Sequence, residues 1–238
     1  MNMAMKRNEE LDLKIANASR KAMLSFPLYI AVPVLFAVAF WLTGYEVEWK
    51  AYGLGALGWI AALFLRGPVS VIVMKMPQER AKNIMIASSG VMEETIRLVL
   101  LAVTSFGSSW ALSVGQGWAA VEVLYVLVTI IAIKSLANRT DEKALQAKQM
   151  LEANGNIQTS PLWGVLERVW ASALHIGATL VVAYNPWTVI ALIPLHSAVN
   201  FIAVLLAAKS IGRSSAFIAA VGGIVLLLGV YFQFILDK

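Results

Sequence analysis

An apolar run from about residue 83 to residue 106 contains two adjacent carboxylates and a guanidinium, in the segment Glu93-Glu94-Thr-Ile-Arg97. The run is long enough to cross a bilayer, because a membrane-spanning helix needs roughly 20 residues. A charged side chain at the centre of a membrane costs about 2.5–3.5 kcal/mol on insertion scales. Such residues usually mark a reaction centre or a transport path, so this segment restricts both the fold and the function of the chain.

The composition of the whole chain is that of an integral membrane protein. Its 238 residues are 59% hydrophobic and 14% charged, whereas soluble domains are about 45–50% apolar and about 25% charged. The apolar runs do not alternate as the strands of a membrane β-barrel do, so the sequence predicts an all-α polytopic membrane helical bundle. The chain has no cysteine, which excludes disulfides, thiolate nucleophiles and iron–sulfur sites.

The hydropathy pattern predicts about seven transmembrane helices. They cover residues 26–44, 51–74, 83–106, 110–133, 162–183, 187–208 and 215–236. With the N-terminus in the cytoplasm, the cytoplasmic segments carry 14 of the 19 lysines and arginines, and the outer side carries two. This asymmetry predicts that orientation in a plasma (inner) membrane. Because the positive charges lie at the ends of the spans and form no basic stripe, we expect no nucleic-acid partner.

Residues 1–25 are expected to form a cytoplasmic or interfacial segment, and residues 26–238 a single transmembrane domain. In the first segment Leu11, Ile15, Ala18 and Ala22 form a helical stripe. The stripe predicts an interfacial helix that leads into the first span, with packing on a soluble partner as the alternative.

Three further features accompany the predicted spans. The longest polar stretch predicts a short surface helix from Asp141 to Ala153, ended by Asn154-Gly155. Arg66 precedes Gly67-Pro68, so we expect it at a break in the second span or reaching toward the interface. Several aromatic residues near outer span ends, Trp118 among them, are expected to form an interfacial belt.

Polar residues on four predicted spans fall at one depth. At about 1.5 Å of rise per residue, they lie roughly 12–20 Å from the predicted cytoplasmic helix ends. The residues at this depth are Glu93 on the third span, Glu122 on the fourth, His175 on the fifth, and His196 and Asn200 on the sixth. Glu94 and Arg97 lie beside Glu93 on its span. Independent structural residues would not agree in depth, so we expect one site near the middle of the membrane.

Spacing along each helix suggests which of these side chains pair. Glu93 and Arg97 are four residues apart and are expected to pair along one helix face, with Glu122 as an alternative structural partner of Arg97. Arg168 and His175 are seven residues apart and share a face. The adjacent pair Glu167-Arg168 lies near the cytoplasmic interface, where we expect an ion pair or a lipid anchor.

Two forms of water activation suit this set of residues. In one, a carboxylate takes the proton of the water while imidazole and amide groups stabilise the oxyanion. In the other, zinc is bound by His175, His196 and a glutamate such as Glu122, and another glutamate acts as the base. The sequence has no His-Glu-x-x-His motif, which would be specific support for the zinc form.

The order of these motifs resembles the CAAX-protease and bacteriocin-processing superfamily of intramembrane proteases. The resemblance spans about residues 83–208, where the glutamate pair is followed by Trp118-x-x-x-Glu122, a mid-span histidine and His196-x-x-x-Asn200. It is nearest to YhfC-type peptidases, with PrsW-like proteases as relatives. In three respects the chain departs from related sequences. Two residues separate the glutamate pair from Arg97, where prenyl endopeptidases have three. Glu122 stands where prenyl endopeptidases have histidine, and Gln116 stands where YhfC-type sequences tend to have one.

The resemblance implies hydrolysis of a peptide bond in or near the membrane. It implies that Glu93 is the general base, that Glu122 takes the place of a water-holding histidine, and that His196 and Asn200 supply an oxyanion hole. Glu94 and Arg97 would then position the base.

The leading hypothesis is a glutamate-dependent intramembrane endopeptidase that requires no cofactor, with a zinc-dependent enzyme as the first alternative. A proton-coupled transporter and a non-catalytic membrane immunity or interaction protein are the others. The expected partners are a membrane-embedded or membrane-associated protein substrate and the lipid bilayer. The sequence leaves open the identity of the substrate and the oligomeric state.

Overall fold

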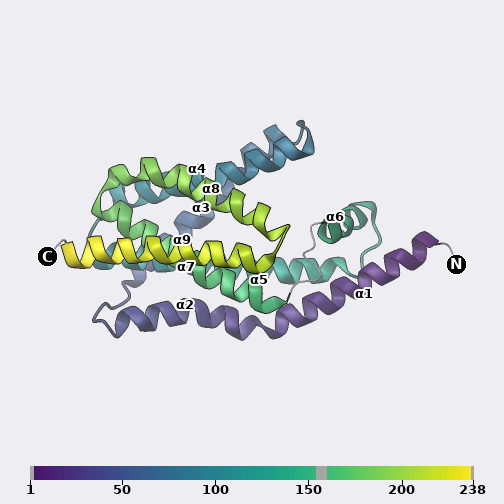
Figure 1. Ribbon diagram of the computed structural model, residues 1–238, viewed down its shortest axis with the longest axis horizontal. Helices are drawn as coiled ribbons and strands as arrows, with labels where there is room; N and C mark the ends of the chain where they lie inside the picture. Colours follow the sequence, from purple (N-terminus) through teal and green to yellow (C-terminus); the bar gives the residue numbers. More distant parts are fainter. Residues whose placement is uncertain (1–2, 154–159, 237–238) are drawn as a thin grey trace.

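The computed structural model describes residues 3–153 and 160–236, and every regular element in these ranges is a helix (Figure 1). The elements are α1 (Met3–Leu24), α2 (Phe26–Trp41), α3 (Trp49–Val73), α4 (Gln78–Val103), α5 (Ser108–Leu136), α6 (Glu142–Ala153), α7 (Pro161–Tyr184), η1 (Pro186–Thr188), α8 (Val189–Ala207), α9 (Ile211–Tyr231) and η2 (Phe232–Leu236). The long helices run roughly along the longest axis of the molecule, and the two chain ends lie at opposite ends of it (Figure 1).

Six helical segments of the described residues are long and apolar enough to cross a membrane. They contain α2, α3, α5, α7, α8 and α9. The 26-residue helix α4 is equally long, but Glu93, Glu94 and Arg97 make it too polar for this group. The six segments and α4 coincide with the seven predicted spans, and the predicted all-α polytopic membrane bundle is confirmed.

Helix α7 lies at the centre of the bundle and packs closely against α5 and α9. Residues 172–183 are buried without interruption, so this helix exposes almost no side chain over three turns. It approaches α9 closely at Gly177, where an added Cβ would lie 2.5 Å from backbone atoms of Val225 and Leu226. Small residues allow such contacts between helices that share a membrane, because backbones there associate largely through close packing.

Helix α4 turns its polar face inward and its apolar face outward. Ser88, Ser89, Gly90, Glu93, Glu94, Arg97 and Leu101 are buried, while Val91 and Val99 are exposed to the surroundings of the bundle. The helix packs between α3 and α8. Gly90 makes the contact with α8 possible, since a Cβ there would meet Ser197 Oγ at 2.4 Å. The buried charges of α4 are therefore held against α8 rather than exposed to lipid.

The N-terminal segment is a helix that packs on its own chain. Leu11 and Ile15 of α1 are buried against Ala137, at the end of α5. Lys148 of α6 is buried and donates hydrogen bonds to Asp12 Oδ1 at 2.5 Å and to the carbonyls of Ala137 and Arg139. The hydrophobic stripe predicted in residues 1–25 thus has a partner within the protein, and α6 ties α1 to α5.

Two local expectations are corrected and one falls outside the described residues. Helix α3 continues through Pro68 without a break, and Arg66 is directed toward α4, where its Nη2 donates to the carbonyl of Met85 at 3.1 Å. Trp118 is fully buried rather than part of an interfacial belt. The surface helix predicted at residues 141–153 is present as α6, while Asn154-Gly155 lies outside the described residues.

Packing of α3 against α5 gives a matched test of the fold. A Cβ at Gly55 would lie 2.0 Å from the carbonyl oxygen of Val114, whereas a Cβ at Gly53 would have no neighbour within 4 Å. We expect Gly55→Ala to destabilise the detergent-solubilised protein by about 1–3 kcal/mol, the usual effect of overpacking. Gly53→Ala should leave stability equal or slightly higher, because alanine favours helix by about 1 kcal/mol. Equal thermal unfolding midpoints for the two variants would contradict this packing.

Candidate active site

A cavity of about 370 Å³ lies between the helices at the level of the charged residues of α4. Its lining includes five of the predicted site residues, namely Glu93, Glu122, His175, His196 and Asn200. Glu94 and Arg97 lie behind this wall and are completely or almost completely buried. The volume is in the range of small-molecule and substrate pockets. The tertiary structure therefore brings the predicted residues of four helices together around one space.

The contact between α4 and α8 depends on Glu94. Its Oε1 lies 2.7 Å from Nδ1 of His196, and its Oε2 lies 3.1 Å from Nη1 of Arg97. A carboxylate accepts hydrogen bonds, so Nδ1 of His196 carries a proton and donates it. In the neutral ring the lone pair is then on Nε2, which faces the cavity side. Glu94 thus fixes both the orientation and the tautomer of His196.

A second set of contacts joins α4, α7 and α5 through His175. Arg97 Nη2 lies 3.1 Å from Nδ1 of His175, and Nε2 of His175 lies 2.7 Å from Oε2 of Glu122. A guanidinium only donates hydrogen bonds, so Nδ1 must accept. The proton of the neutral ring is therefore on Nε2 and is donated to Glu122. Both nitrogens of His175 have partners in this arrangement.

Glu122 is held in turn by Arg168 of α7. Arg168 donates through Nη1 to Oε1 of Glu122 at 2.6 Å and through Nη2 to Oε1 of Glu167 at 2.6 Å. The Glu122 side chain is 20% exposed, compared with 1% for Glu94. Glu122 is thus the site carboxylate that combines a fixed position with access to the cavity.

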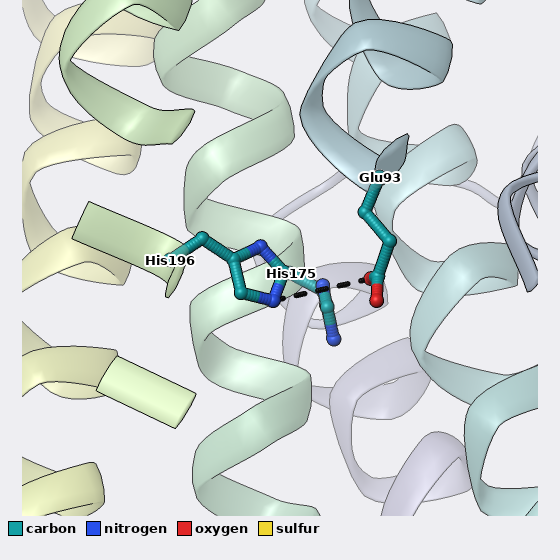
Figure 2. A group of neighbouring side chains, drawn as sticks. All are labelled: Glu93, His175 and His196. Carbon is teal, nitrogen blue, oxygen red and sulfur yellow. Dashed lines mark ion pairs between the residues drawn. The ribbon is translucent and has the colours of Figure 1, made fainter. Parts of the chain in front are cut away.

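Glu93 has a different environment from the other buried carboxylates. Its Oε2 accepts a long hydrogen bond from Trp118 Nε1 at 3.4 Å and lies 4.0 Å from Nε2 of His196 (Figure 2). No lysine or arginine within residues 3–153 and 160–236 pairs with it. Burying an unpaired charge is strongly unfavourable, so Glu93 requires a proton, a protonated His196 or a bound cation.

Several predicted pairings are corrected by this geometry. Arg97 pairs with Glu94, three residues earlier, rather than with Glu93. Glu122 pairs with Arg168 and His175 rather than with Arg97. Asn200 lines the cavity as predicted, but its Nδ2 donates to Ser89 Oγ at 2.7 Å, which anchors α8 to α4.

Two residues of the site were not predicted to belong to it. The expected ion pair of Arg168 with Glu167 is present, but Arg168 also binds Glu122 directly, which was not predicted. Its seven-residue spacing from His175 was the available signal, because that spacing places both on one helix face. Trp118 contacts Glu93 and lies under the guanidinium of Arg97, whose Cζ is 4.8 Å from the ring centroid. Only the tertiary structure reveals that contact.

The donor set also fits a divalent metal ion. Ligand atoms of Glu93, His175 and His196 lie within 4.8 Å of one another (Figure 2), and two imidazoles with one carboxylate form a known catalytic zinc set. The lone pair of His196 Nε2 and the uncompensated carboxylate of Glu93 are ready to bind a cation. His175 fits only after its Nε2 proton leaves and the ring separates from Glu122, and metal binding commonly releases such protons.

Comparisons with known proteins identify the family. No curated protein and no solved structure matches the chain. The sequence model described as "YhfC intramembrane metalloprotease" matches residues 28–222, from α2 into α9. This match covers most of the chain and includes every residue of the site. The chain therefore belongs to the YhfC intramembrane metalloprotease family.

Proposed function

We propose that the protein is a metal-dependent endopeptidase that hydrolyses a peptide bond of a membrane-embedded protein substrate within this cavity. The observation that carries the proposal is Glu93, a buried carboxylate that faces His196 and pairs with no lysine or arginine of the described residues. The family description agrees with such an enzyme. We also propose, from the charge pattern of the loops, that it acts in a plasma membrane with its N-terminus in the cytoplasm.

The charges around the cavity favour a bound cation. Glu93, Glu94, Glu122 and Glu167 carry four negative charges, and Arg97, Arg168 and Arg66 carry three positive ones. With both histidines neutral, one negative charge remains in excess. A cation held by Glu93, His196 and His175 would offset it. When bound, it would polarise the scissile carbonyl and lower the pKa of the attacking water.

The remaining residues perform the proton transfers and the positioning. Glu122 takes a proton from the attacking water as its oxygen bonds to the carbonyl carbon, and then delivers a proton to the departing amine as the C–N bond breaks. Arg168 keeps Glu122 ionised and in place. Glu94 holds the ring of His196 through Nδ1, the kind of outer contact that orients metal-binding imidazoles.

A metal-free glutamate protease is the second candidate, and the hydrogen bonding of His175 favours it. With Arg97 on Nδ1 and Glu122 on Nε2, that ring has no free lone pair. Glu93 would then act as the base, as the resemblance to the CAAX-protease and bacteriocin-processing superfamily implies. In this scheme Glu122 and His175 form a fixed wall of the site.

The first prediction concerns Glu93. Glu93→Gln should abolish cleavage of membrane proteins, because both schemes need its negative charge. The measurement compares protein N-termini in membranes of cells that carry the wild-type or the variant protein. Glu79→Gln is the matched control, since Glu79 is exposed in the first turn of the same helix. Fragments that persist unchanged in Glu93→Gln cells at normal protein levels would contradict the proposal.

The second prediction separates the two schemes by metal content. Purified protein should contain about one zinc ion per chain, and a chelator should inhibit it reversibly. His196→Ala should lose the metal, and Glu94→Gln should bind it about 10–100-fold more weakly, the usual effect of removing an outer-shell partner. Elemental analysis with titration of zinc measures both. Chelator-resistant cleavage by metal-free protein would replace this scheme with the glutamate scheme.

The third prediction concerns Arg168. Arg168→Met leaves Glu122 without its arginine partner in a partly buried place, so we expect a loss of about 1–3 kcal/mol in stability. The matched control is Arg139→Met, because Arg139 also forms an ion pair, with Asp141, but its side chain is 56% exposed. Exposed pairs contribute about 0–1 kcal/mol. Thermal unfolding in detergent measures the difference, and equal losses would show that the Glu122 contact is not a buried pair.

A further inference from the structure

Arg66 is a second charged group of the cavity without a charged partner. It is half-buried on α3 and lines the same cavity as Glu93 and His196. Its Nη2 donates to the carbonyl of Met85, and its Nε is buried without any partner among the described residues. Arg66 forms no ion pair with the carboxylates of those residues, in contrast to Arg97 and Arg168.

The position of the guanidinium favours a ligand inside the cavity over lipid. The neighbours Leu65, Gly67 and Pro68 are exposed on the outer side of α3, whereas the contact of Arg66 with Met85 directs its side chain toward α4. An arginine in an apolar span needs an anionic or acceptor partner, because unpaired charge is costly there. The single carbonyl bond leaves donors of the guanidinium available, since this group has five N–H bonds.

We propose that Arg66 binds a carboxylate of the substrate, either an acidic side chain or a free C-terminus, and thereby determines where the chain is cut. This inference rests on the proposed function and deepens it. Guanidinium and carboxylate groups match in a two-point hydrogen-bonded geometry, which makes arginine the preferred partner for this group.

The distance along α4 sets the register of the cut. Met85 accepts the hydrogen bond of Arg66 and therefore marks the level of the guanidinium along α4. At about 1.5 Å of rise per residue, Met85 and Glu93 are roughly 12 Å apart. An extended peptide advances about 3.3 Å per residue. The carboxylate should therefore lie about three to four residues from the scissile bond.

Binding of defined probes tests the inference independently of catalysis. Three N-decanoyl tetrapeptides share the sequence Leu-Ala-Leu-X, where X is aspartate amide, asparagine amide or asparagine with a free carboxylate. Dodecyl phosphate serves as the probe for a lipid headgroup. Affinities are measured with wild-type protein and with Glu93→Gln, Arg66→Lys, Arg66→Gln and Arg80→Gln variants in phosphatidylcholine nanodiscs. Arg80 is the matched control, because it is exposed in the first turns of α4 and does not line the cavity.

We expect at least one carboxylate probe to bind the wild-type protein about tenfold or more tightly than the neutral amide. The preference should persist in Glu93→Gln and Arg80→Gln, weaken in Arg66→Lys and vanish in Arg66→Gln. The better of the two carboxylate probes identifies a side chain or a C-terminus as the recognised group. If the protein shows no Glu93-dependent cleavage but still prefers a carboxylate probe, the Arg66 site is supported although the proposed hydrolysis is not.

Three outcomes would overturn the inference. One is that the wild-type protein binds the charged and neutral probes with equal affinity, or binds none of the peptides measurably. Another is tighter binding of dodecyl phosphate than of either carboxylate probe, which would assign Arg66 to lipid. The third is an unchanged preference in Arg66→Lys and Arg66→Gln. If Arg66→Gln does not fold, Arg66→Lys decides the matter, and a preference unchanged in that variant overturns the inference.

Discussion

The architecture of the site depends on one continuous series of hydrogen bonds inside the bundle, which links carboxylates with guanidinium groups and imidazoles. It runs from His196 through Glu94, Arg97, His175, Glu122 and Arg168 to Glu167, and joins α8, α4, α7 and α5. Each charged group would be costly in lipid on its own. Within the series each one has a partner, and removing a single member leaves another buried and unpaired. The four helices are therefore held in one relative position by the same groups that form the site.

Two charged side chains that line the cavity, those of Glu93 and Arg66, do not belong to this series. Glu93 lies on α4 and Arg66 on α3, their charges have opposite signs, and they are not paired with each other. A protein fold would normally neutralise such groups or expose them to water. Their retention beside an open space suggests that their partners come from outside the chain, a cation or proton for Glu93 and an anionic part of the substrate for Arg66. Reaction and recognition would then occupy two ends of one cavity.

Sequence patterns located the spans and brought most residues of the cavity together, but they did not give the pairings. Hydropathy located the helices of the bundle from α2 to α9 other than the short α6, because a lipid-exposed helix must be apolar over most of its length. The similar predicted depths of four residues in the membrane correctly indicated that they line one cavity, namely Glu93, Glu122, His175 and His196. The expected pair of Glu93 with Arg97 was wrong, since residues three and four positions apart are both neighbours on a helix and spacing does not choose between them. Arg97 pairs with Glu94, the glutamate that is held in place by its contact with His196 of α8.

The sequence by itself determined the all-helical membrane fold and the family, because both follow from local composition and from the order of motifs along the chain. Only the tertiary structure decided which protons lie on His175 and His196, that Trp118 and Arg168 belong to the site, and that Arg66 shares the cavity. These properties depend on rotation and lateral packing of helices that are far apart in the chain. In a bundle, close contacts such as that of Gly90 with Ser197 set the rotation and packing, and hydropathy along one helix carries no record of them.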